Sequence, residues 1–176
     1  ANYFASLGIK KGDRVMLILK RHYQFWIAIL ALHKIGAVCI PATFQLTEKD
    51  IVYRVDAAEC RMIISVDDPD LLTFISSAKA KCKTLSHLAV VGEHIPEGFH
   101  DFRREIGAYS DELERIYNHQ TDPMLMYFSS GTTGFPKAIL HTHRSLMHSC
   151  RVEQAHHGQT RDDCFLCIPP LYHTGA

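Results

Sequence analysis

The residues best suited to chemistry lie at 127–137, where the sequence reads YFSSGTTGFPK. Gly131 and Gly134 lack a Cβ atom and can adopt positive φ, so the backbone can approach a ligand closely. Successive backbone N–H groups in such a turn form an anion-binding site. Lys137, which follows a proline, adds a positive charge. Further hydrogen-bond donors come from the hydroxyl groups of Ser129, Ser130, Thr132 and Thr133. The stretch therefore predicts a phosphate-binding loop.

Two common phosphate motifs do not fit this loop. A Walker loop has lysine directly after its second glycine, whereas Phe-Pro separates Gly134 from Lys137 here. The dinucleotide motif GxGxxG is absent. An ordinary flexible loop would not need two threonines between two glycines, or a lysine behind a proline. The loop also follows an apolar run at 124–128, and open α/β sheets bind ligands at the ends of such strands.

Short apolar runs alternate along the chain with segments of helical periodicity. Strands are predicted at 14–19, 37–40, 61–66, 85–91, 124–128, 137–141 and 164–168. Helices are predicted at 23–35, after a Thr47–Asp50 capping box, after Asp68-Pro69, from Ser110 or Asp111 through Tyr117, and from a Thr142 cap to about His156. Strands separated by helices favour βαβ units. We therefore expect an α/β fold with a mostly parallel, Rossmann-like sheet flanked by helices, in a single domain over 1–176.

The helix predicted at 23–35 is apolar on two sides. One stripe consists of Tyr23, Trp26, Ile27 and Leu30, and the other of Phe25, Ala28, Ile29 and Leu32. A helix that is apolar on most sides is buried on most sides. We expect one stripe to face the sheet and the other an element absent from this chain. We hypothesise that the chain self-associates through whichever stripe does not face the sheet.

Composition excludes several classes of protein. Hydrophobic residues make up 47% of the 176 residues and charged residues 22%, which is typical of globular chains. The net charge is zero and no basic block is present, so a nucleic acid is not an expected partner. The longest apolar run, 25–32, is too short to span a bilayer. Six scattered cysteines and the lack of a signal-peptide pattern favour a reducing, cytoplasmic location.

A metal site is not expected from the cysteines or the histidines. Cys164 and Cys167 form a CxxC pair, but no second pair follows. On the strand predicted there, positions i and i+3 point to opposite faces, so the two thiols would diverge. The chain has twelve histidines, but their spacing does not supply the further ligands that zinc requires.

The loop resembles the signature of the adenylate-forming enzymes, which include acyl- and aryl-CoA synthetases. The family pattern is roughly Ser/Thr-Ser/Thr-Gly-Thr-Thr-Gly-x-Pro-Lys-Gly, often with Tyr before it and Thr-His after it. Tyr127 and Thr142-His143 stand in those places, and Ala138 replaces the usual glycine. Three other segments also resemble the family, so the resemblance covers most of the chain: GIKKGDRVMLIL, LALHKIGAVCIPATFQLTEKDIVYRVDAAECRMIIS and PPLYHTGA.

The resemblance implies a reaction in two steps. A carboxylate attacks the α-phosphate of ATP to give an acyl-adenylate and pyrophosphate, and a thiol, usually that of coenzyme A, then takes the acyl group. Magnesium would bridge phosphate oxygens, and Ser130 or Thr132 could touch it. Tyr172 and His173 would line the acyl pocket. The ATP phosphates would be held by Ser129, Ser130, Gly131, Thr132, Thr133, Gly134 and Lys137.

The resemblance also implies that parts of the family's machinery lie outside this chain. These parts include the adenine-binding segment, the catalytic lysine and the C-terminal domain, so we expect a piece of the AMP-binding domain, truncated at both ends and inactive alone. A fatty or other carboxylic acid is the expected substrate of the whole enzyme, although an amino or aryl acid stays open. A non-catalytic nucleotide-binding or interaction module is the alternative from another class. A different phosphotransferase with a chance loop does not explain GAVCIP and PPLYH.

Overall fold

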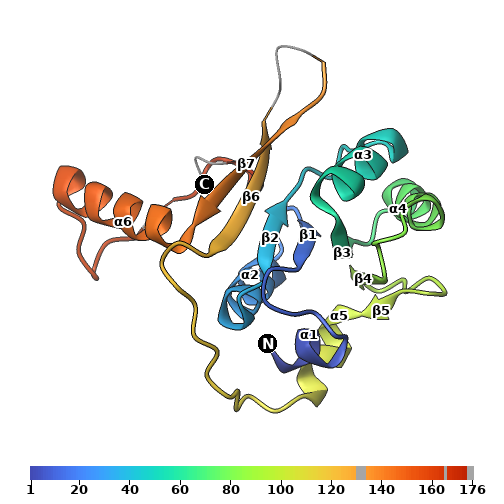
Figure 1. The fold of residues 1–176 in the computed structure, drawn as a ribbon, viewed down its shortest axis with the longest axis horizontal. Coiled ribbons are helices and arrows are strands. Elements are labelled where there is room, and N and C mark those ends of the chain that lie inside the picture. Colours follow the sequence, from blue (N-terminus) through green and yellow to red (C-terminus); the bar gives the residue numbers. More distant parts are fainter. Residues whose placement is uncertain (130–133, 165, 174–176) are drawn as a thin grey trace.

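The computed structural model describes residues 1–129, 134–164 and 166–173. Its strands form one sheet in the order β5-β4-β3-β1-β2-β6-β7 (Figure 1). Neighbouring strands are parallel throughout, except that β7 is antiparallel to β6. The expected α/β fold with a mostly parallel sheet is confirmed. The strands are β1 (Arg14–Ile18), β2 (Val38–Pro41), β3 (Cys60–Val66), β4 (His87–Val91), β5 (His100–Asp101), β6 (Pro123–Ser129) and β7 (Lys137–Thr142).

Helices cover both faces of the sheet. Helix α2 connects β1 to β2, and α3 connects β2 back to β3 on the other side of β1. Because crossovers are right-handed and these two run in opposite directions, the two helices lie on opposite faces (Figure 1). Helix α4 packs beside α3. The helices are α1 (Asn2–Ser6), α2 (Gln24–Ile35), α3 (Glu48–Ala58), α4 (Pro69–Lys81), α5 (Phe102–Glu105) and α6 (His143–His157), with a 3-10 turn η1 (Ile106–Ala108) after α5.

Side-chain caps begin three of these helices where the sequence predicts them. The Asp50 N–H donates to Thr47 Oγ1 over 3.4 Å and the Thr47 N–H donates to Asp50 Oδ2 over 3.1 Å, which completes the capping box of α3. Asp68 Oδ1 accepts from the backbone of α4, and Thr142 begins α6 with a capping box of its own. These bonds satisfy backbone N–H groups that have no partner inside the helix.

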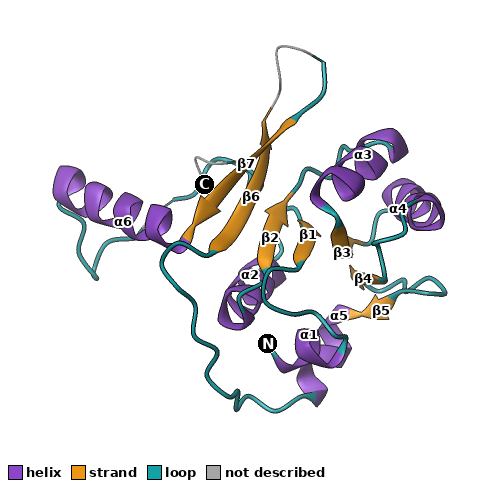
Figure 2. Cartoon of the chain, viewed as in Figure 1, coloured by secondary structure: helices purple, strands orange, loops and turns teal. Residues whose placement is uncertain are grey.

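Two predicted elements are wrong. Residues 110–117 are irregular, and the connection from 109 to 122 runs as a loop along the molecule (Figure 2). Contacts with distant residues fix this loop: Lys11 Nζ donates to the carbonyl of Tyr117, and the Asn118 amide donates to the carbonyl of His33. At 164–168, residue 165 lies outside the described residues and the others pair with no strand. Carbonyls of this stretch accept hydrogen bonds from the side chain of Arg21 instead.

The first stripe of α2 is also more exposed than its apolar character predicts. The stripe with Phe25, Ala28 and Leu32 is buried against the sheet. The other stripe faces outward, with exposed fractions from 41% to 67% at Tyr23, Trp26, Ile27 and Leu30. The expectation that α2 is buried on most sides is therefore wrong for the described structure. Self-association through this stripe stays a prediction.

Candidate functional site

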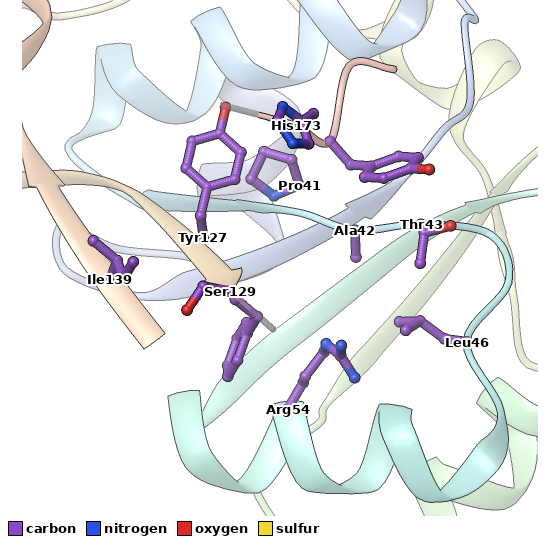
Figure 3. A pocket seen from close by; sticks show the side chains of 11 residues that line it. Pro41, Ala42, Thr43, Leu46, Arg54, Tyr127, Ser129, Ile139 and His173 are labelled. Carbon is purple, nitrogen blue, oxygen red and sulfur yellow. The ribbon is translucent and has the colours of Figure 1, made fainter. Parts of the chain in front are cut away.

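A pocket of about 390 Å³ opens at the carboxyl ends of β2 and β6. Three stretches that are far apart in the sequence meet there: the segment after β2, the end of β6, and residues 172–173 (Figure 3). Helix α3 contributes one side chain from the opposite side. The lining residues are Pro41, Ala42, Thr43, Leu46, Arg54, Tyr127, Phe128, Ser129, Ile139, Tyr172 and His173.

The pocket brings together some of the residues that the sequence predicts. Ser129, at the start of the loop, lies in the same pocket as Tyr172 and His173. Lys137 begins β7 directly opposite Ser129 in the antiparallel register, but it is exposed and does not line the pocket. Gly134 has φ of 105°, a conformation that glycine adopts without strain. The other predicted phosphate ligands, Ser130, Gly131, Thr132 and Thr133, lie outside the described residues.

The two limbs of the loop are tied together and to α3. Ser129 Oγ donates to the carbonyl of Lys137 over 3.4 Å, across the β6–β7 pair. Tyr53 on α3 donates its hydroxyl hydrogen to the Pro136 carbonyl over 2.9 Å. The Tyr53 ring stacks on Phe135 with centroids 4.9 Å apart and meets Phe128 edge-on at 6.4 Å. One side chain of α3 therefore contacts the limb that enters the loop and the limb that leaves it.

Arg54, the next residue of α3, extends into the pocket (Figure 3). Its side chain is 13% exposed, and its guanidinium carbon lies 5.4 Å from the centre of the Phe128 ring. Nη1 donates to the Asp50 carbonyl over 3.2 Å and lies 3.7 Å from the Asp50 carboxylate. Burial lowers the pKa of Arg54, and the nearby Asp50 carboxylate only partly opposes that shift. The pocket thus contains a largely buried cation.

A second arginine holds the segment that carries Tyr172 and His173. Arg21, in the turn between β1 and α2, donates to the Cys167 carbonyl over 2.8 Å, to that of Ile168, and to that of Pro169 over 3.4 Å. The following Leu171 is 7% exposed and packs into the core. The segment is therefore held by Arg21, in the turn after β1, and by the packing of Leu171 into the core, just before it reaches the pocket.

Sequence reasoning missed Tyr53, Arg54 and Arg21. Tyr53 and Arg54 lie outside the apolar stripe of α3, where polar side chains on a helix are most simply solvated. The Asp50–Arg54 spacing indicates an i, i+4 ion pair, which is common on helix surfaces. This side of α3 lines the pocket only because β6, which follows more than sixty residues later in the sequence, packs against it.

Other kinds of site find no support in the part of the chain that the structure describes. Within it, no group of three or more His, Cys, Asp or Glu side chains could hold a metal ion. Cys164 is exposed, while Cys167 is half-buried and contacts the Pro169 carbonyl. No helix among the described residues is long and apolar enough to cross a membrane.

Comparison with known proteins identifies the family. The sequence model described as "AMP-binding enzyme" matches residues 1–176. The chain belongs to this family. Relatives include the mitochondrial acyl-coenzyme A synthetases ACSM3 of Mus musculus, 38% identical over 140 residues, and ACSM1 of Homo sapiens, 35% identical over 144 residues. These matches cover 80% and 81% of this chain but 24% and 25% of the relatives, so the chain spans about a quarter of their length.

Solved structures of the family share the fold. The acyl-CoA synthetase of Brucella canis matches with a TM-score of 0.82 and 27% identity, over 97% of this chain and 31% of that one. The anthranilate CoA ligase AuaEII, solved with anthranoyl-AMP, also has a TM-score of 0.82, with 26% identity over 88% of this chain and 30% of the ligase. These matches confirm the expected membership of the chain in the adenylate-forming enzymes.

Proposed function

We propose that the complete protein in which this chain occurs is an AMP-forming acyl-CoA synthetase. A carboxylate oxygen of the acid attacks the α-phosphorus of ATP, the bond to the bridging oxygen of the β-phosphate breaks, and pyrophosphate leaves. The sulfur of coenzyme A then attacks the acyl carbon and AMP leaves. The names of the relatives support this assignment, since both ACSM proteins and the Brucella canis protein are acyl-CoA synthetases.

One structural observation at the site supports this proposal most directly. The pocket joins the first residue of the phosphate-binding loop, Ser129, to the segment with Tyr172 and His173. The reaction needs the phosphates and the acid in contact, because the attacking oxygen and the phosphorus atom must meet in line. A pocket that borders both predicted binding segments provides this proximity. A nucleotide-binding module without catalysis would have no need of the second segment.

The residues of the loop have defined roles in this proposal. Ser129, Ser130, Gly131, Thr132, Thr133, Gly134 and Lys137 bind the phosphates of ATP, and Tyr172 and His173 border the acyl chain. Hydrogen-bond donors fixed in advance stabilise the charge that develops on departing pyrophosphate. Mg²⁺ accompanies ATP and neutralises part of that charge, and Ser130 or Thr132 would be its nearest protein contacts.

A fatty or other aliphatic carboxylic acid is the proposed substrate, with an aryl acid as the second candidate. The pocket walls favour an apolar group, because Pro41, Leu46 and Ile139 face it. The aryl alternative rests on the anthranilate CoA ligase, whose bound anthranoyl-AMP is an aryl adenylate. An amino acid would need a partner for its ammonium group, and no carboxylate belongs to the described lining of the pocket.

Acid-dependent exchange of pyrophosphate into ATP tests the proposal. The complete protein should catalyse exchange with aliphatic acids of a preferred chain length, and more weakly with benzoate and anthranilate. Addition of coenzyme A should then release AMP and acyl-CoA. A protein that binds ATP but supports no exchange with any acid would instead be a nucleotide-binding module. The 176-residue chain alone should give no exchange.

Two broader interpretations accompany this proposal. Residues 1–176 are taken as a single α/β domain, which limited proteolysis can examine.

A cytoplasmic location stays a prediction from the cysteines, whereas the ACSM relatives are mitochondrial by name. Cell fractionation with an antibody against the protein separates these two locations.

A further inference from the structure

The charged side chain that lines the described part of the pocket is a cation. Of its lining residues within the described chain, none carries a carboxylate. Arg54 carries a permanent positive charge, because a guanidinium stays protonated at any physiological pH. The surrounding walls are mainly apolar or aromatic, which lowers the local dielectric and strengthens the field of this cation. A ligand that carries negative oxygens is therefore favoured at this point.

The charge of Arg54 is only partly compensated by the protein. Its acidic neighbour is Asp50, whose Oδ2 is already held by the backbone N–H and the hydroxyl of Thr47. The other oxygen of Asp50 lies 3.7 Å from Nη1, which is beyond ordinary hydrogen-bond length. Among the described residues, the hydrogen bond that Arg54 donates goes to the Asp50 carbonyl. A guanidinium has five N–H groups, so most of those of Arg54 have no acceptor among the described residues and can bind a ligand.

The position of Arg54 matches the place where the reaction must occur. It lies against Phe128, next to the start of the phosphate-binding loop, and shares the pocket with Tyr172 and His173 (Figure 3). The planar fork of a guanidinium fits the paired oxygens of a carboxylate or a phosphate. A largely buried cation without full pairing is unfavourable in the unliganded protein, and an anionic ligand would relieve that.

We propose that Arg54 is a binding residue for the anionic oxygens of the reacting groups, either the carboxylate of the acid or a phosphate of ATP. This inference rests on the acyl-CoA synthetase function proposed above and adds a residue from α3 to the binding site. The two sources share the same chemistry, and steady-state kinetics with each substrate varied in turn distinguishes them.

The test uses the complete protein with Arg54→Gln and Arg54→Lys. Arg54→Gln removes the charge while keeping much of the side-chain volume, and should raise one KM roughly 10- to 100-fold, as expected for a lost hydrogen-bonded charge. Arg54→Lys keeps the charge without the fork and should fall between the wild type and Arg54→Gln. Arg103→Gln, a change at an exposed arginine on α5, is the matched control and should leave both KM values unchanged.

The affected substrate decides the source of the anion. A raised KM for the acid with an unchanged KM for ATP assigns Arg54 to the carboxylate. A raised KM for ATP, with weaker inhibition by inorganic pyrophosphate, assigns it to the phosphates. If Arg54→Gln and Arg54→Lys both leave the two KM values within twofold of the wild type, Arg54 only supports the Phe128 ring and the inference is wrong.

Direct titration separates this inference from the proposed function. If the wild type supports no exchange with any acid, the synthetase assignment fails, and calorimetric titrations with pyrophosphate and with octanoate still examine Arg54. Weaker binding of either anion to Arg54→Lys would then support the anion site. Equal binding of both anions by the wild type and Arg54→Lys would overturn it. Should Arg54→Gln fail to fold by circular dichroism, the Arg54→Lys comparison alone decides.

Discussion

The molecule consists of two regions that are built differently. The compact region comprises β1 to β5 with helices α1 to α5, and the arm comprises β6, β7 and α6 (Figure 1). In the compact region, the side chains of Val15 to Ile18 on β1 are wholly buried between helices. In the arm, the first four residues of β7 are exposed and α6 has no buried residue.

This contrast shows how the candidate binding loop is supported. The loop belongs to the arm, but contacts that fix its limbs come from Tyr53 in the compact region. The pocket likewise takes Arg54 from α3 and residues 41–46 from the segment after β2. The candidate binding residues therefore lie at the boundary between the two regions, with Arg54 on the compact region and Ser129 on the arm.

Truncation of a leucine should have its largest effect in the compact region. Leu32→Ala, at a wholly buried position on α2, should lower the free energy of unfolding by about 2–5 kcal/mol. Leu30→Ala on the exposed stripe of the same helix and Leu146→Ala on α6 should each change it by less than about 0.5 kcal/mol. Chemical denaturation of the 176-residue chain measures all three. A loss at Leu146 as large as that at Leu32 would mean that the arm has a buried core of its own.

Removal of the charge of Lys137 should affect function much more than stability. Lys137 is exposed at the first residue of β7, so Lys137→Ala should leave the melting temperature of the complete protein nearly unchanged. If the lysine stabilises charge on the phosphates, kcat/KM for ATP should fall roughly 100-fold. Lys83→Ala, at an exposed lysine after α4 that does not line the pocket, is the control. A normal kcat/KM for ATP in Lys137→Ala would remove Lys137 from the phosphate site.

Loss of the Tyr53 hydroxyl should have a smaller effect on the same loop. Tyr53→Phe keeps the stacking on Phe135 but removes the hydrogen bond to the Pro136 carbonyl. Loss of one such bond corresponds to about 1 kcal/mol, so KM for ATP should rise roughly fivefold while KM for the acid stays the same. Tyr23→Phe, at a tyrosine that is 67% exposed, should change neither KM. Equal increases in both KM values would indicate a general disturbance of the pocket.

The contacts of His33, where α2 meets the arm, should make the free energy of unfolding depend on pH. Burial lowers the pKa of His33 on α2 from 6.5 to about 4, even though the Met124 carbonyl of β6, 3.1 Å from Nε2, favours the protonated form. The ring of His143, at the start of α6, lies 6.0 Å from that of His33 and opposes protonation as well. Between pH 6.5 and about 4, the unfolded chain therefore binds a proton that the folded chain does not.

The free energy of unfolding should consequently decrease as the pH falls through that window, and His33→Gln should weaken this dependence. Urea denaturation of the wild type and the variant at several pH values between about 7 and 4.5 provides the measurement. The difference between the two proteins should be smallest near neutral pH, where the histidine is uncharged in both the folded and the unfolded state. Parallel pH profiles would show that His33 does not cause this dependence.

Local signals in the sequence were sufficient for most of the strands and for the starts of the longer helices. Apolar runs bounded by turns gave the strands, and Thr47, Asp68 and Thr142 gave the starts of three helices, because capping depends on residues within a few positions. The composition of 129–137 predicts a phosphate-binding loop from local residues as well, and that role stays a prediction. The features that the sequence did not predict depend on interactions between residues that are far apart in the sequence.

These misses follow from tertiary contacts. The stretch 110–117 has a possible cap, but bonds from Lys11 and to His33 favour an extended path. The apolar stretch at 164–168 has strand-like residues, but Arg21 binds its carbonyls. From its local sequence, Arg54 is expected to be a solvated helix residue, because its burial depends on β6, which pairs with β2. No local pattern contains that information, because each partner lies tens of residues away.

The pairing of β2 with β6 also has a kinetic consequence. Cys39 pairs with Leu125 in the parallel register, so this contact closes a chain segment of more than eighty residues. Strands β1 to β4 pair across much shorter separations, and pairings that close long segments generally form late and slowly. We expect the compact region to form first during refolding, with the β6–β7 hairpin adding afterwards. The pocket, whose lining includes residues 127–129 of β6, would then form only after the compact region has folded.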